Sequence, residues 1–160
     1  RGSKMIKEQF KDSYKLLKKH LKDIDESEAT FQPDIANNNI KWQLGHLILL
    51  NDFLVFETIN GDNALKQPVT KYFLWGTSPL NFDRNEPSLE ELKLLLDEQF
   101  DRIFNNLEEQ LKKDRSEAIG LKDSGIVMES FNESIHFAII HMNRHFGQIV
   151  MLKSMIHKLK

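Results

Sequence analysis

Towards its C-terminal end the chain reads NESIHFAIIHMNRHFGQI, residues 132–149. Apolar residues recur in this stretch with the 3.6-residue period of an α-helix. The pattern predicts one long helix that begins near Met128 and continues almost to the last residue. His141 and His145 are four residues apart in it, so both imidazoles lie on one helix face, roughly 6 Å apart. Two imidazoles at this spacing can hold one metal ion.

The same helix carries a second apolar face. It consists of Ile139, Met142, Phe146 and Val150. A helix that is apolar on two sides is either buried within the monomer or packed against another subunit. Both readings stay open, and a homodimer that uses this face, where Gly147 would let a neighbouring backbone come close, is one of the two.

Three further segments have helical periodicity, and no segment has the alternation of a half-buried strand. They cover approximately residues 7–21, 39–58 and 89–111. The second begins among Asn37, Asn38 and Asn39, which are good N-cap residues. The third begins at a capping box formed by Ser88 and Glu91.

The lengths of the connections predict how the helices are arranged. About 15 residues join the first two helices and the last two, whereas about 28 residues, from 59 to 87, separate the second and third. A connection this long is uncommon unless it crosses over or covers a site, and it can return the chain to the end where the second helix began. We therefore predict an all-α fold, an up-down-down-up four-helix bundle with a long connection between helices 2 and 3.

Length and composition limit the class of protein. The 160 residues predict a single domain over residues 5–160, and Arg1-Gly2-Ser3-Lys4 before Met5 resembles an expression scar. A formal charge of −2 argues against a nucleic-acid partner. No apolar run approaches the roughly 18 residues of a membrane span and no secretory signal is visible, so we expect a cytoplasmic protein without a membrane partner. Cysteine is absent, which excludes disulfides, a thiolate nucleophile and cysteine-ligated zinc.

A third histidine, His46, interrupts another apolar helix face in the second helix. A lone histidine of this kind is usually a hydrogen-bonded core residue. Because buried imidazoles without partners are costly, two on one helix and one on another favour a shared ligand, a single metal ion. His136 lies about 140° around the helix from His141 and cannot join them. His20 and His157 lie near helix ends, where they interact with the helix dipole or face water.

Polar residues near these histidines are candidates for supporting hydrogen bonds. Gln148 lies on the His141 face of the last helix, and Gln43 lies one turn from His46. Asn39, two turns from His46, is a candidate for the mouth of the site. All three could equally be ordinary polar residues at the end of the bundle. Glu57 is roughly 16 Å from His46 along the helix, too far to be a ligand.

The long connection contains an aromatic cluster. It consists of Tyr72, Phe73, Leu74 and Trp75. The cluster could wall a substrate pocket or plug the open end of the bundle, and we favour the plug slightly.

Two stretches together resemble the signatures of the DinB/YfiT-like superfamily: NIKWQLGHL, residues 39–47, and HMNRHFGQI, residues 141–149. The resemblance covers nearly the whole chain in helix order, including the long connection. It implies an up-down-down-up four-helix bundle, often a homodimer, and a divalent metal held by His46, His141 and His145. Many members carry Glu directly after the first histidine of the last helix. This chain has Met142 there, which puts any helper role of that carboxylate in doubt.

Three neutral imidazoles would leave at least one position on the ion open, as in catalytic rather than structural sites. Zinc, nickel and iron(II) all suit imidazole ligands, and each lowers the pKa of a bound water or thiol. Relatives in the resembled family include thiol-dependent transferases and mycothiol-dependent isomerases.

The predicted function is therefore metal-dependent transfer of a low-molecular-weight thiol to a small electrophile. The alternatives are a hydrolase that uses activated water and a non-catalytic, stress-linked dimer that binds a metal or ligand. A ferritin-like di-iron site fits less well, because it requires Glu-x-x-His on two helices, and only Glu133 and His136 have that spacing.

Overall fold

The computed structural model describes residues 1–58 and 67–159. Most of this length is helical. The elements are α1 (Gly2–Leu21), α2 (Glu26–Thr30), α3 (Ile40–Phe56), α4 (Gln67–Phe73), a 3-10 turn η1 (Pro79–Asn81), α5 (Leu89–Gln110), β1 (Asp114–Leu121), β2 (Ile126–Ser130) and α6 (Phe131–Leu159).

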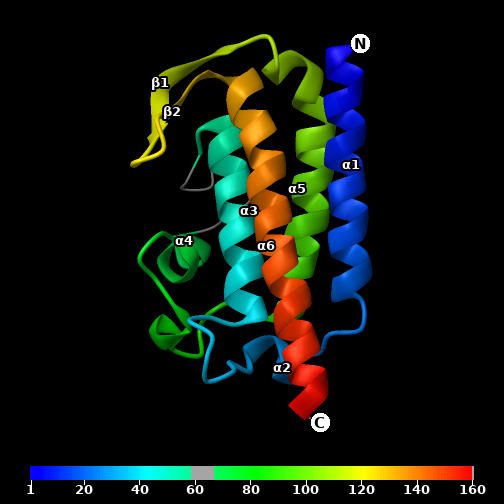
Figure 1. Ribbon diagram of the computed structural model, residues 1–160, viewed down its shortest axis with the longest axis vertical. Helices are drawn as coiled ribbons and strands as arrows, with labels where there is room; N and C mark the ends of the chain where they lie inside the picture. Colours follow the sequence, from blue (N-terminus) through cyan, green and yellow to red (C-terminus); the bar gives the residue numbers. More distant parts are fainter. Residues whose placement is uncertain (59–66, 160) are drawn as a thin grey trace.

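The four longest helices, α1, α3, α5 and α6, lie side by side along the long axis of the molecule (Figure 1). The colours in Figure 1 show that α1 and α6 run in one direction and α3 and α5 in the other. α3 packs against both α5 and α6, and α1 packs against the same two helices. Almost every residue of α3 is buried, as expected for a helix that is apolar on nearly all sides.

Two predicted helix starts are confirmed by their caps. Asn39 caps α3, because its side-chain oxygen accepts a hydrogen bond from the backbone N–H of Trp42 at 2.9 Å. Ser88 and Glu91 form the predicted reciprocal capping box at the start of α5. α1 begins at Gly2, so most of the segment that resembles an expression scar forms the first turn of this helix.

The prediction that no segment is a strand is wrong for residues 114–130. Here β1 and β2 pair as an antiparallel hairpin, and their connection contains Asp123 and Gly125 with positive φ. The hairpin has almost no buried face: Arg115 and Met128 are its two buried residues. It therefore lacks the alternation that marks a half-buried strand. Because Met128 belongs to β2, α6 begins at Phe131, later than predicted.

The long connection between α3 and α5 contains α4 and η1, and residues 59–66 of it lie outside the described residues. α4 packs along α3 and buries Tyr72 and Phe73. The ring of Phe73 lies directly on the backbone of Gly45, where any Cβ would overlap it. Two members of the aromatic cluster therefore belong to the core, whereas Trp75 is 52 % exposed.

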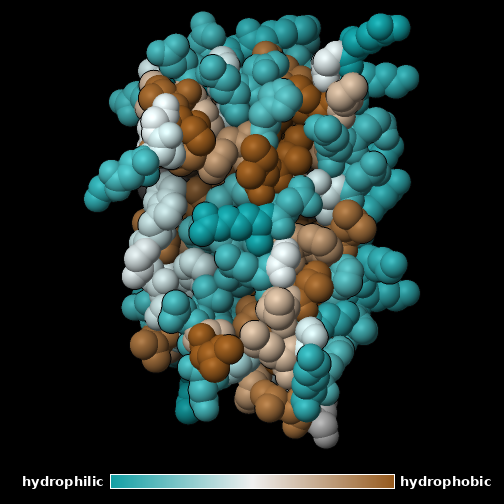
Figure 2. Space-filling model, in the orientation of Figure 1, coloured by the Kyte–Doolittle hydropathy of each residue, from teal (hydrophilic) through white to brown (hydrophobic). Residues whose placement is uncertain are grey.

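The surface is mostly hydrophilic in the view of Figure 2, with separate patches of hydrophobic side chains, some of them over α6. Within the described part of the chain, no helix is both long and apolar enough to cross a membrane.

Candidate metal centre

The structure brings His46, His141 and His145 together. His46 comes from α3 and the other two from the neighbouring helix α6, and one ligand atom from each lies within 4.8 Å of the others. The ring centroids of His141 and His145 are 4.4 Å apart. The ring of His46 lies 5.6 Å from that of His141 and 5.0 Å from that of His145. The predicted set of three ligand candidates thus forms one compact group.

The backbone of α4 fixes the orientation of His46. Its Nδ1 lies 2.7 Å from the carbonyl oxygen of Phe73. Because a carbonyl only accepts hydrogen bonds, Nδ1 carries the proton, and Nε2 of the neutral ring keeps a free lone pair. Trp42 stacks on the ring at a centroid distance of 4.6 Å, and its indole N–H donates to Thr77. These contacts hold Nε2 of His46 in place as a ligand.

Gln43 fixes His145 in the same way. The amide nitrogen of Gln43 donates to Asn38 at 2.8 Å, so the amide oxygen faces His145 and accepts from its Nδ1–H. Nε2 of His145 is then unprotonated in the neutral ring. The sequence predicted a supporting role for Gln43 beside His46, one turn away, whereas its observed partner is 102 residues away on α6.

His141 completes the group. Its Nε2 lies 3.1 Å from Nε2 of His145. Two Zn–N bonds of about 2.0–2.1 Å at a tetrahedral angle would separate their nitrogens by roughly 3.3 Å, so this spacing fits a single ion. The buried Nδ1 of His141 finds no hydrogen-bond partner in the described parts of the chain. Three converging imidazoles, two with their outer nitrogens already bonded, therefore fit a divalent metal ion.

All three rings are neutral at ordinary pH. Burial lowers the pKa of His46, and it lowers the pKa of His141 to about 4 and that of His145 to about 3. The neighbouring histidines of the group lower the pKa values of His141 and His145 further, and the positive charge of Arg144 adds a smaller lowering of all three pKa values. Neutral imidazoles are the form that binds metal, so no proton has to leave at pH 7.

Within the described residues, neither of the two remaining candidates for the site forms a hydrogen bond with the three histidines. The amide nitrogen of Asn39 donates to the Thr30 carbonyl, and its amide oxygen accepts from the backbone N–H of Trp42. Both polar atoms of this side chain therefore form hydrogen bonds at the start of α3. Gln148 is half-buried, and its side chain makes no hydrogen bond within residues 1–58 and 67–159. Glu57 caps the far end of α3 and binds Ser116, in agreement with its exclusion as a ligand.

Met142 replaces the carboxylate found in many members of the resembled family. Its side chain is fully buried, and its sulfur lies 3.7 Å from the amide nitrogen of Asn51 on α3. The side chain at this position therefore points into the helical core.

The other three histidines lie outside the group. His20 contacts the edge of Phe146, His157 lies 3.0 Å from a carboxylate oxygen of Glu28, and His136 is exposed. Two groups that orient the site could not be predicted from the sequence. They are the Phe73 carbonyl, which bonds to His46, and Asn38, which bonds to Gln43. A backbone carbonyl carries no residue-type signal, but the Gly45–Phe73 contact shows that a glycine within an apolar helix can mark such a close approach.

Comparison with known proteins gives one family. The model of a family described as the DinB superfamily matches residues 9–149, which include both helices of the candidate centre. No curated protein matches the chain.

Proposed function

Since the chain belongs to the DinB superfamily, we propose that it binds one divalent metal ion through His46, His141 and His145. The observation that carries this proposal is the convergence of three neutral imidazoles, two of them oriented by the Phe73 carbonyl and by Gln43. Zinc, nickel and iron(II) all suit such ligands.

The proposed activity is transfer of a low-molecular-weight thiol to a small electrophile. A metal ion held by three imidazoles has an open position and lowers the pKa of a thiol bound there. In the overall reaction the thiol loses its proton to water, its sulfur forms a bond to the electrophilic carbon, and the leaving group departs with its bonding electrons and can take up a proton from water. The positive charge of Arg144 on α6, which lowers the pKa values of the three histidines, would also favour a thiolate bound to the metal, although Arg144 is exposed and water screens its charge. We expect the reaction to take place in the cytoplasm.

The first test is elemental analysis of protein purified without a polyhistidine tag. We expect about one metal ion per chain, and its loss in His46→Ala and in His141→Ala. His136→Ala is the matched control, because His136 is an exposed histidine of the same helix. Protein that holds no metal even after reloading, or that loses metal equally in the control, would contradict the proposed site.

The second test separates thiol transfer from hydrolysis by activated water, since both reactions need the same three histidines. The metal-loaded protein is incubated with a model electrophile, with and without an added thiol. Turnover only with thiol supports the proposed transferase. Turnover without thiol would show that the protein is a hydrolase. No turnover under either condition would indicate that it binds metal without catalysing either reaction.

We also propose that the architecture is an up-down-down-up four-helix bundle that forms a homodimer. The opposite directions of the two helix pairs support the bundle (Figure 1). On the outer side of α6, Ile140 and Met151 are 64 % and 59 % exposed, and a Cβ at Gly147 would meet open space. A second subunit could cover these residues, whereas Met142 of the face predicted from sequence is buried within the chain. Sedimentation analysis of Ile140→Lys against the unaltered protein tests the dimer.

A further inference from the structure

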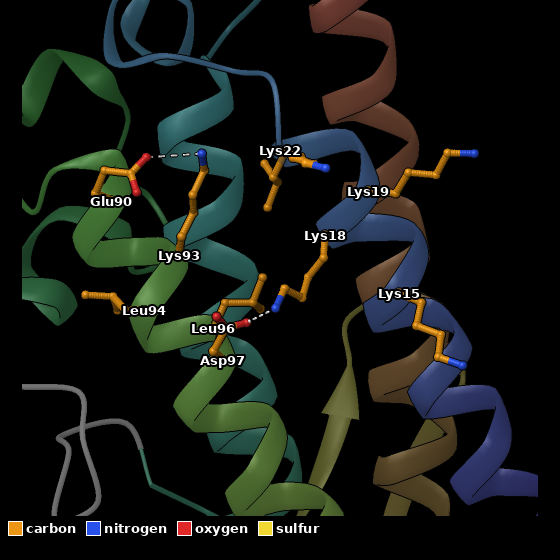
Figure 3. A pocket seen from close by; sticks show the side chains of 10 residues that line it. Lys15, Lys18, Lys19, Lys22, Glu90, Lys93, Leu94, Leu96 and Asp97 are labelled. Atoms are coloured by element: carbon orange, nitrogen blue, oxygen red, sulfur yellow. Dashed lines mark hydrogen bonds and ion pairs between the residues drawn. The ribbon is translucent and has the colours of Figure 1, made fainter.

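A groove with a volume of about 650 Å³ lies between the second half of α1 and the first half of α5 (Figure 3). Its floor is apolar, because Leu21 and Leu96 line it and are almost fully buried. Leu94 stands at its edge and is 63 % exposed. None of the three ligand candidates of the metal centre lines this groove. The volume is in the range of small-molecule sites.

Three lysines of α1 and the lysine that caps its C-terminal end line one side of the groove. They are Lys15, Lys18, Lys19 and Lys22. Their spacing, i, i+3, i+4 and i+7, places all four on one face of the helix. Like charges at these spacings repel one another, whereas the position of Lys18 and Lys19 in the last turn of α1 lets them interact favourably with the helix dipole.

The pairing between α1 and α5 shows which of these charges lacks a counterpart. Lys18 and Asp97 form an ion pair of 2.6 Å across the groove (Figure 3), and Lys7 lies 3.6 Å from Glu108 further along. The helices run in opposite directions, so four residues onward on α1 corresponds to four residues back on α5. The residue of α5 opposite Lys22 is therefore Lys93. In the other two pairs the residue of α5 is acidic.

Lys22 and Lys93 lie on opposite sides of the same end of the groove (Figure 3). Lys93 contacts its helical neighbour Glu90 at 3.2 Å and the carbonyl oxygen of Ile24 at 3.3 Å. Lys22 has no ion-pair partner within the described residues. Lys22 thus brings an unpaired positive charge to the end of the apolar floor where Lys93 also lies, although its amine end points away from Lys93 in Figure 3. An anion bound at this end would attract both flexible side chains.

We propose that the groove binds a single-chain anionic amphiphile such as a medium-chain carboxylate. Its head group lies between Lys22 and Lys93, and its alkyl chain covers Leu94 and Leu96. The lysine stems add apolar surface along the chain. A free amphiphile fits better than a membrane surface, because Glu90 and Asp97 at the groove would repel a flat anionic layer.

Isothermal titration of the full chain with decanoate, below its micelle concentration and at low salt, tests this proposal. We expect saturable binding of about one decanoate per chain, weakened roughly tenfold by Lys22→Gln or by Lys93→Gln. Lys122→Gln is the matched control, since Lys122 is exposed on the hairpin and lies outside the groove. Octanoate should bind roughly tenfold more weakly than decanoate, and Leu94→Ser should reduce this difference. His46→Ala should bind decanoate like the unaltered chain, which separates this site from the metal centre.

Three results would overturn the proposal. Decanol binding as tightly as decanoate would show that the lysines do not recognise the head group. If decanoate does not bind saturably, or if Lys122→Gln weakens its binding as much as the groove variants do, the groove is not the binding site. Retention on anionic phospholipid vesicles that decanoate cannot displace would assign the lysines to a membrane surface. Thermal unfolding of each variant checks that the fold is retained.

Discussion

At the scale of single residues, the candidate centre depends on groups that accept hydrogen bonds from its histidines. The Phe73 carbonyl and the Gln43 amide each bond to the outer nitrogen of one ring and leave the inner nitrogen free. The histidines could be predicted from sequence, because they are polar exceptions on apolar helix faces. The role of Phe73 could not, because its contribution comes from the backbone and depends on how α4 packs on Gly45.

Gly45→Ala tests this dependence. The new methyl group overlaps the Phe73 ring, so α4 must move and carry the Phe73 carbonyl away from His46. We expect a loss of about 1–3 kcal/mol in the free energy of unfolding and a metal affinity that is about 10–100-fold lower. The measurements are denaturant unfolding and a competitive metal titration.

Gly147→Ala is the matched control for this substitution. Gly147 is also a helical glycine, but a Cβ there meets nothing within 4 Å. The control should gain about 0.5–1 kcal/mol from the better helix propensity of alanine and keep its metal affinity. Equal metal affinities for the Gly45 variant and the control would refute the proposed link between α4 and His46.

The buried histidines also predict how stability depends on pH. Burial lowers the pKa of His141 to about 4 and that of His145 to about 3, whereas an unfolded histidine has a pKa of about 6.5. Below that pH the unfolded chain binds protons that the folded chain does not. The metal-free protein therefore loses stability as the pH falls from about 6.5 towards 4, and the same two groups contribute no slope above that range.

Denaturant unfolding of the metal-free protein at several pH values between about 7.5 and 4.5 measures this slope. His141→Gln and His145→Gln should each give a shallower decline than the unaltered protein. Identical declines in all three proteins would show that the two histidines titrate in the folded state as they do in water.

At the scale of elements, the helix starts could be predicted from short stretches of sequence, whereas the hairpin could not. Asn39, Ser88 and Glu91 cap their helices through bonds within three residues, so a short stretch of sequence contains the whole signal. The hairpin is held by pairing between β1 and β2, and by Arg115, which reaches the carbonyls of Leu54 and Phe53 on α3. Contacts of this kind join residues about 60 positions apart and leave no local pattern.

α3 and α5 are joined by a buried polar network, and this network predicts a stability effect. Asp52 is fully buried, and it accepts hydrogen bonds from Arg102 at 3.1 Å and from Gln99 at 3.0 Å. A second guanidinium nitrogen of Arg102 lies 2.9 Å from the same carboxylate in an ion pair. Asp52→Asn leaves the mostly buried Arg102 without its carboxylate and should cost about 2–4 kcal/mol in thermal or denaturant unfolding. Glu108→Gln, which removes an exposed ion pair with Lys7, should cost less than about 1 kcal/mol. Similar losses for the two variants would contradict a structural role of the network.

At the scale of the whole molecule, the centre exists only in the assembled fold. Its ligand candidates come from α3 and α6, and the Phe73 carbonyl comes from the long connection between α3 and α5. The length of this connection predicts that it covers a site or crosses over, because loops of this length are otherwise rare. The helical class and the three histidines were also predictable, whereas the contact of Gln43 with His145 depends on the lengthwise alignment of α3 with α6.

A metal ion that binds only the folded chain should raise its thermal stability. At a free zinc concentration one hundred times the dissociation constant, the expected gain is about 2.7 kcal/mol, which raises the Tm by roughly 5–10 °C. Differential scanning calorimetry with and without zinc measures this shift, and His46→Ala should show almost none. A shift of the same size in His46→Ala would place the zinc elsewhere on the protein.

The near-complete burial of α3 also has a consequence for synthesis. A ribosome adds about 5–20 residues per second, and Gln43 precedes its partner His145 by 102 residues. For roughly 5–20 s the nascent chain therefore carries an apolar helix whose main neighbours, α5 and α6, are still incomplete. During that interval α3 exposes apolar surface that a chaperone can bind.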